Sequence, residues 1–183
     1  AIGLCIGNHT VTITVNCLTS YTTTVSITAA GGPTVTPTVQ NLKCNGDSSG
    51  SVAISVIGGT PAYTYNWNPS SGTASNVTGL SAGIHTVIVT DFSGCSSAQT
   101  ITITEPTVLT VSTPTVANVK CNSQCTGSAS INVTGGVPGY TYSWNTIPAQ
   151  TTANASGLCA GMYSCTVTDA NGCDSTLTLT ISE

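Results

Sequence analysis

The sequence predicts an all-β protein built from tandem antiparallel β-sandwiches, and three observations support this fold class. Short segments alternate apolar residues with Thr or Ser at period two, as half-buried strands do. Turn-forming clusters of Gly, Pro, Ser and Asn separate these segments. A long stretch of sequence also occurs twice, which identifies a repeat architecture. Helical periodicity is missing from the sequence, which argues against parallel β-α units.

The repeat sets the domain organisation. One copy spans residues 44–95 and the next spans 121–173, and each copy begins and ends with a cysteine. The opening cysteines are 77 residues apart (121 − 44), as are Trp67 and Trp144 (144 − 67). The closing cysteines are 78 residues apart (173 − 95), so the second copy has one additional residue.

The N-terminus corresponds to half a repeat, because residues 3–13 align with 157–167 and Cys17 stands at the closing position. We therefore predict three segments and expect them to be part of a longer array. They are the C-terminal half of a truncated or externally completed repeat (1–32), a first full sandwich (33–106) and a second full sandwich (107–183).

Individual strands follow from the alternation, at about seven short strands per 77 residues. The expected strands, up to the end of the first full repeat, are 10–15, 22–28, 51–57, 62–67, 84–90 and 99–104. The aromatic stripe of Tyr63, Tyr65 and Trp67, repeated as Tyr140, Tyr142 and Trp144, is interpreted as sandwich core rather than as a sugar-stacking surface.

Composition excludes several classes of partner. The chain has 183 residues, of which 4% are charged and 39% hydrophobic, with a net charge of −4. Its composition is that of a folded β protein and not of a disordered one. The two basic residues, Lys43 and Lys120, cannot form a basic patch, so no nucleic-acid partner is expected. No apolar run approaches the length of a membrane span, so no membrane insertion is expected.

Nine cysteines at repeating positions predict a disulfide framework and an oxidising compartment. The repeat register predicts three bonds, Cys44–Cys95, Cys121–Cys173 and Cys125–Cys159. The third is inferred because Cys125 and Cys159 occur together, whereas Ser48 and Ser81 occupy both equivalent positions in the first repeat. Zinc is not expected, since the Cys121-x3-Cys125 spacing has no counterpart in the first repeat.

Three cysteines remain. Cys165 replaces Val87 on an inward-facing position and is expected to be a buried free thiol. By register, Cys5 and Cys17 belong to bonds whose other halves lie in the missing first part of the N-terminal repeat, with a Cys5–Cys17 bond as the alternative. We expect strands from outside to complete the half repeat, because an isolated two-stranded hairpin is marginally stable in water.

The ionisable residues predict no catalytic centre, no metal site and no cofactor. Asp91 and Asp169 occupy equivalent positions before a turn and are interpreted as turn caps rather than as calcium ligands. His9 and His85 stand where Tyr163 stands in the second repeat, which indicates half-buried packing positions rather than catalytic bases. The protein is therefore not expected to be an enzyme.

A family resemblance follows from the repeated motif. Cys-Asn, Gly-Gly-x-Pro-x-Tyr-Thr-Tyr-x-Trp, Leu-x-Ala-Gly and Val-Thr-Asp-x-x-Gly-Cys resemble the SprB-type repeat of cell-surface adhesins. The resemblance implies sandwiches similar to immunoglobulin and PKD domains, an extracellular or cell-surface location, and a structural role in an adhesin stalk or fibre. Its implied partners are neighbouring repeats of the same or another copy, with surface glycans as further candidates.

Two alternatives stay open at this point. One is a self-assembling extracellular filament joined by strand exchange, and the other is a module that binds glycan or ice. Candidate glycosylation positions are the sequon residues Asn76 and Asn154, and Ser175 in Asp174-Ser175-Thr176, which resembles a bacterial O-glycosylation pattern.

Overall fold

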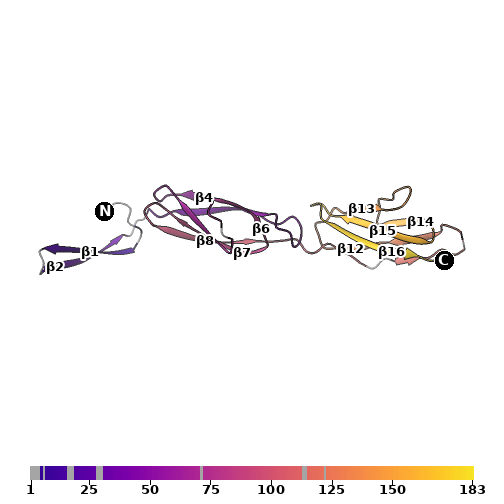
Figure 1. Ribbon diagram of the computed structural model, residues 1–183, viewed down its shortest axis with the longest axis horizontal. Helices are drawn as coiled ribbons and strands as arrows, with labels where there is room; N and C mark the ends of the chain where they lie inside the picture. Colours follow the sequence, from indigo (N-terminus) through magenta and orange to yellow (C-terminus); the bar gives the residue numbers. More distant parts are fainter. Residues whose placement is uncertain are drawn as a thin grey trace. The chain divides into compact units, whose positions relative to one another are not determined.

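The protein is described here by a computed structural model. It describes residues 5, 7–15, 19–27, 31–70, 72–112, 115–121 and 123–183. The regular structure in these ranges consists entirely of β-strands, paired antiparallel (Figure 1). The predicted all-β, antiparallel fold class is confirmed.

The chain divides into two compact units. The first comprises Ala1–Gln40 and Gly50–Ile103, and the second comprises Asn41–Ser49 and Thr104–Glu183. Residues 1–32, predicted as a separate segment, fall within the first unit. The loop Asn41–Ser49, although it lies between two strands of the first unit, belongs to the second.

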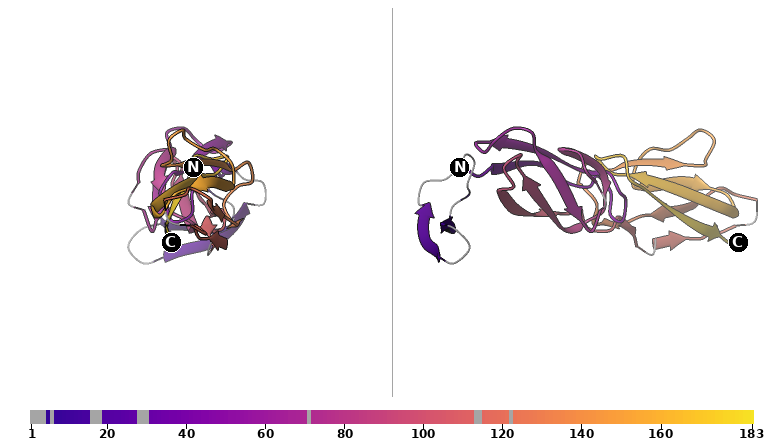
Figure 2. Two further views of the ribbon diagram at one scale, coloured as in Figure 1. Left: turned by 90° about the vertical axis from the view of Figure 1, so that its right-hand side faces the viewer. Right: turned by 60° about the vertical axis from the view of Figure 1, so that its left-hand side comes forward.

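The first unit contains a sandwich of two three-stranded sheets (Figure 2). One sheet has the order β3-β4-β6 and the other has the order β5-β7-β8. Their bounds are β3 Thr34–Gln40, β4 Gly50–Ile57, β6 Asn76–Leu80, β5 Thr64–Asn68, β7 Gly83–Thr90 and β8 Ser96–Ile103. The hairpin β7–β8 pairs Thr90 with Ser96, so β8 begins three residues before the predicted start at 99.

The second unit repeats this arrangement. Its larger sheets have the orders β10-β11-β14 and β13-β15-β16. Their bounds are β10 Thr115–Ala117, β11 Gly127–Ser130, β14 Asn154–Leu158, β13 Thr141–Trp144, β15 Gly161–Thr168 and β16 Asp174–Ile181. A short ladder of β9 (Thr110–Val111) with β12 (Val133–Thr134) stands where the first unit has the remaining part of its β3–β4 ladder.

The N-terminal half repeat forms a ribbon of two strands, β1 (Gly7–Val15) and β2 (Thr19–Ile27). Among the described residues these strands pair only with each other. The face that carries Val11 and Ile13 is exposed, at 44% and 56% respectively. The ribbon therefore lacks the covering sheet that both sandwiches have.

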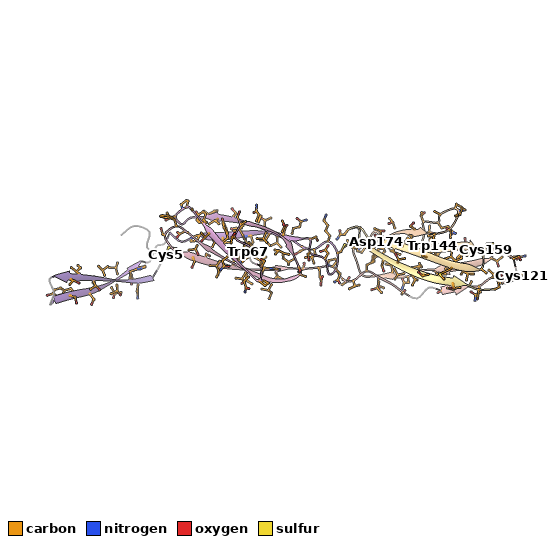
Figure 3. All side chains as sticks on the ribbon, viewed as in Figure 1. Cys5, Trp67, Cys121, Trp144, Cys159 and Asp174 are labelled. Atoms are coloured by element: carbon orange, nitrogen blue, oxygen red, sulfur yellow. A yellow bond between two sulfur atoms is a disulfide. The ribbon has the colours of Figure 1, made fainter. Side chains whose placement is uncertain are left out.

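The tryptophans lie in the cores of the two sandwiches, as interpreted from the aromatic stripe. Trp67 is 3% exposed and Trp144 is 2% exposed (Figure 3). Each indole N–H donates a hydrogen bond to a backbone carbonyl, Ala74 O for Trp67 and Thr152 O for Trp144, at 2.9 Å in both cases. A buried indole requires such a partner, because an unpaired buried N–H is costly.

Candidate functional site

The turn that closes each repeat is organised by one buried aspartate. Asp91 accepts hydrogen bonds from the backbone N–H groups of Thr60 (2.9 Å) and Cys95 (2.8 Å). Asp169 accepts the equivalent bonds from Val137 and Cys173, both at 2.9 Å. Each carboxylate thus holds its own closing turn against the Gly-Gly turn of the same repeat. This is the turn-capping role predicted for both residues.

These hydrogen bonds also keep the two carboxylates ionised. The backbone N–H of Thr60 is the largest cause that lowers the pKa of Asp91 below its ordinary value, and the N–H of Val137 does the same for the pKa of Asp169. Within the described residues no group of three or more His, Cys, Asp or Glu side chains is arranged to hold a metal ion.

A glycine precedes each of the residues, Thr60 and Val137, that donate to the aspartates, and the backbone geometry requires it. Gly59 and Gly136 have φ values of 70° and 62°. A Cβ atom at Gly59 would lie 2.9 Å from Asp91 Oδ2, and one at Gly136 would lie 2.8 Å from Asp169 Oδ2. Only glycine combines this backbone conformation with this close approach.

The loop Asn41–Ser49, here called the first opening loop, is held by its own side chains. Asp47 accepts from the N–H groups of Cys44 (3.1 Å) and Ser49 (3.0 Å), and the Ser49 hydroxyl accepts from Lys43 N–H (2.9 Å). The Ser49 hydrogen bond is the largest cause that lowers the pKa of Asp47. The loop is therefore a shaped surface, not an unstructured connection.

The first opening loop receives the closing turn of the second repeat. Cys44 and Cys173 form a disulfide with a Cα–Cα distance of 5.7 Å. Beside the bond, Asn171 Nδ2 donates to Lys43 O at 2.8 Å. In the same loop, Gly46 N–H donates to Glu105 Oε2 at 2.6 Å and Asn45 Nδ2 donates to Pro106 O at 3.0 Å.

The predicted Cys44–Cys95 and Cys121–Cys173 bonds are wrong. Leu42 N–H donates to Thr104 O at 3.0 Å, so the first opening loop lies beside the end of β8, whereas Cys95 precedes its start. An eight-residue strand is about 25 Å long, while bonded cysteines have Cα atoms about 4.4–6.8 Å apart. Val119 N–H donates to Ser182 O in the second repeat, so the same separation applies to Cys121 and Cys173.

The remaining pairs differ in outcome. Cys125 is bonded to Cys159, the pair inferred from their joint occurrence. Cys5 is bonded to Cys95, with a Cα–Cα distance of 5.3 Å, which corrects both pairings considered for Cys5. The expectation for Cys17 lies outside the described residues.

Cys121, predicted to be bonded, is an exposed free cysteine. Cys165 is free and fully buried, as expected from its inward-facing position. Burial is the largest cause that raises the pKa of the Cys165 thiol. The two free cysteines thus differ sharply in their accessibility.

Three residues at one repeat position make the same local contact. His9 Nε2 lies 2.7 Å from Cys5 O, His85 Nε2 lies 3.0 Å from Ser81 O, and the Tyr163 hydroxyl donates to Cys159 O at 3.1 Å. Each contact reaches the carbonyl four residues back. His and Tyr are interchangeable here because both present a donor at the tip of a flat ring.

The candidate glycosylation residues differ in accessibility. Asn76 and Asn154 are exposed, and Ser175 is half-buried in β16. Asn154 Oδ1 accepts from the Ser130 hydroxyl at 2.6 Å. Modification of these residues stays a prediction.

The disulfide between the two repeats was not predicted, because the repeat register shows which cysteines are equivalent and not which cysteines are close in space. One signal was present in the sequence. The expected strand 99–104 separates the closing cysteine Cys95 from the junction at Glu105, so these two residues stand at opposite ends of one strand. Asn45 and Asn171, which contact the junction and the loop, were not singled out. Asn45 belongs to the Cys-Asn dipeptide that both repeats share.

Fold and site together define a tandem β-sandwich protein whose repeats are joined by disulfides. The SprB repeat family model matches residues 36–72 and 113–149, so two segments of the chain are similar to the SprB repeat. The SprB repeat is a non-catalytic module of cell-surface proteins. No helix among the described residues is long and apolar enough to cross a membrane.

Two further comparisons complete this picture. No curated protein sequence matches the chain. Among solved structures, an amphioxus IgVJ-C2 molecule is similar at 11% sequence identity and a TM-score of 0.31. That match covers 84% of this chain and 97% of the other. The strand pairing, and not this similarity, defines the fold.

Proposed function

We propose that this chain is a structural segment of an extracellular adhesin stalk, in which each SprB repeat is bonded covalently to the next. The match to the SprB repeat supports a surface module, and three disulfides are consistent with an oxidising compartment. The role is mechanical: it limits how far the chain extends under load.

The observation that carries the proposal is the Cys44–Cys173 bond. Cys44 opens the first repeat and Cys173 closes the second, so the bond joins the two repeats. It spans a sequence separation of 129 residues. A force applied to the chain ends cannot extend the residues inside this covalent loop, even after both sandwiches unfold.

Single-molecule force extension of the full chain, tethered at its ends, tests the proposal. Reduction should add the contour length of 129 residues, about 430–460 Å at ~3.3–3.6 Å per residue. Pairing within each repeat would hide 51 residues (95 − 44) and 52 residues (173 − 121), or about 340–370 Å. A gain of the smaller size, or none, would refute the proposed linkage.

A second function, self-assembly through the half repeat, is favoured by the exposed apolar face of the β1–β2 ribbon. Val11, Ile13, Tyr21 and Val25 share this face and are 44%, 56%, 70% and 44% exposed. Uncovered strands and apolar faces recruit further strands. Neighbouring copies of the chain are the proposed partners.

Sedimentation velocity over a range of concentrations tests self-assembly. Ile13→Lys should abolish association by placing a charge on the apolar face. Thr12→Lys, on the opposite face of the same strand, is the matched control and should leave association unchanged. A monomer at all concentrations would refute this function.

Binding of glycan or ice remains the alternative from the sequence. Trp67 and Trp144 are buried and therefore do not offer a stacking surface to a sugar. A glycan array and an ice-affinity test address these two alternatives directly.

A further inference from the structure

The second repeat contains a loop equivalent to the first opening loop. This second opening loop, described at residues 118–121 and 123–126, begins with the same Asn-(Leu/Val)-Lys-Cys-Asn sequence as Asn41–Asn45. Its attachment to the adjoining chain is also the same. Val119 N–H donates to Ser182 O at 3.0 Å, and Ser182 N–H donates to Asn118 Oδ1 at 3.1 Å. These bonds match Leu42 to Thr104 and Thr104 to Asn41, each at 3.0 Å.

The backbone of the second opening loop matches that of the first at one described position. Ser123 occupies the position of Gly46, and the two residues have φ values of 65° and 73°. Ser123 is the sole non-glycine with positive φ in the described part of the chain. Serine adopts this conformation at a cost, so its presence here shows that the loop shape is imposed by its surroundings. The Cys125–Cys159 bond contributes to this by fixing the loop to the end of β14.

The two loops differ in what they hold. The first binds a closing turn through the Cys44–Cys173 disulfide and the hydrogen bond from Asn171 to Lys43 O. In the second, Cys121 is exposed and free. The closing turn of the second repeat does not reach Cys121. Figure 3 shows Cys121 and Asp174, the neighbour of Cys173, at opposite ends of the second unit.

We propose that the second opening loop is a docking site for the closing turn of a further SprB repeat, and that Cys121 forms a disulfide with its closing cysteine. The partner residue equivalent to Asn171 would donate to Lys120 O beside the bond. The inference does not rest on the thiol alone, because the equivalent loop of this chain holds that partner through the same cysteine. It rests on the proposed function, since it extends the same linkage to another repeat.

The bond forms by thiol oxidation. Two thiols, Cys121 and the closing cysteine, lose two protons and two electrons to become one disulfide. The electrons pass to a small-molecule disulfide, such as oxidised glutathione, through a mixed disulfide. The oxidant is released as two thiols.

An extended chain provides the test. A second copy of residues 106–183 is appended after Glu183, reproducing the Glu105-Pro106 junction. The appended copy carries Ser175→Ala as a mass label for its closing peptide, and Cys121→Ser so that the Cys121 peptide comes only from the original loop. After equilibration in a glutathione redox buffer, alkylation and non-reducing peptide mapping follow the state of Cys121.

Cys121 should be alkylated in the 183-residue chain and lose this labelling in the extended chain, with its peptide bonded to the labelled closing peptide. The control carries Cys173→Ser in the appended copy, and there Cys121 should stay alkylatable.

Alkylation of Cys121 in the extended chain, or its bonding to any cysteine other than a closing one, would overturn the inference. A Cys121–Cys121 dimer belongs to this second outcome, because it would identify a merely accessible thiol. The force-extension test of the Cys44–Cys173 linkage does not involve Cys121. Its result therefore separates failure of this inference from failure of the proposed function.

Discussion

The β1–β2 ribbon and the β15–β16 hairpin are versions of one half repeat with opposite burial. Their registers correspond, with Gly7 opposite Ile27 in the ribbon and Gly161 opposite Ile181 in the hairpin. Matched inward positions have very different exposed fractions. Ile13 is 56% exposed and Val167 is 0% exposed; Val25 is 44% exposed and Leu179 is 8% exposed.

The difference lies in what covers the hairpin. In the second unit, Leu179 and Val167 belong to one buried cluster with Ala129 of β11 and with Ala155 and Leu158 of β14. Those residues lie on the other sheet of the sandwich. Strand formation and pairing are thus local properties of the half repeat, whereas burial requires the second sheet. Four predictions test this comparison.

The largest expected effect is the truncation of a matched inward residue. Leu179→Ala should lower the free energy of unfolding of the second unit by about 2–5 kcal/mol, because it leaves a cavity in a packed core. Val25→Ala, at the matched ribbon position, should change stability by no more than about 0.5 kcal/mol. Urea unfolding followed by tryptophan fluorescence measures both effects, with Trp144 as the signal for Leu179→Ala in a Trp67→Phe background and Trp67 as the signal for Val25→Ala in a Trp144→Phe background. Equal effects at the two positions would contradict the comparison.

The closing turn of the hairpin also has an acid sensitivity that the ribbon lacks, since the turn before Cys17 contains no aspartate. The pKa of Asp169 is lower in the folded protein than its ordinary value, so its stabilising contribution is fully present above about pH 4. That contribution is lost as the pH falls through the lowered folded pKa.

Asp169→Asn should therefore destabilise the second unit at pH 7, because the amide nitrogen cannot accept a backbone N–H. The difference from the unsubstituted protein should shrink as the pH falls below about 4 and through the lowered folded pKa of Asp169, where the native carboxylate becomes protonated. Thermal unfolding from pH 2 to pH 7 measures both effects. A difference independent of pH would show that the carboxylate charge is not involved.

The third prediction compares the native thiol of Cys165 with a thiol introduced at the matched ribbon position, Val11. Cys165→Val should change the free energy of unfolding by less than about 1.5 kcal/mol, because Val87 fills the same position in the first repeat. In the folded protein Cys165 should resist alkylation, since burial raises the pKa of its thiol. A cysteine introduced by Val11→Cys should react at once. Fast reaction at both positions would show that the sandwich core opens readily.

The smallest effect is expected where the two half repeats make the same local contact. Tyr163→Phe removes the hydrogen bond to Cys159 O and should cost about 0.5 kcal/mol, the low end for an exposed neutral pair. His9→Phe removes the equivalent contact in the ribbon and should leave the unfolding of the second unit unchanged. Urea midpoints of both variants measure this, and a loss above about 2 kcal/mol for Tyr163→Phe would indicate a role in core packing.

The amino-acid sequence predicted the repeat, its turns, its inward-facing residues and most of its strands, although β3 and β6 were not among the expected strands. Each depends on neighbouring residues: alternation in β7 and β15, glycine at Gly59 and Gly136, and an aspartate before each closing turn. Trp67, Trp144 and the buried Cys165 were identified because repeated inward positions tolerate only apolar or hydrogen-bonded side chains.

The partners of the opening and closing cysteines and the exposure of the ribbon depend on the tertiary structure, whereas the Cys125–Cys159 bond could be inferred from the sequence. The repeat register shows which residues are equivalent, but it does not show which opening loop lies beside which closing turn. The eight-residue β8 and β16 place the opening and closing cysteines of one repeat at opposite ends, and a disulfide tolerates no such distance. Val25 and Leu179 likewise have the same local pattern, and only the presence of a second sheet makes one a surface residue and the other part of a core.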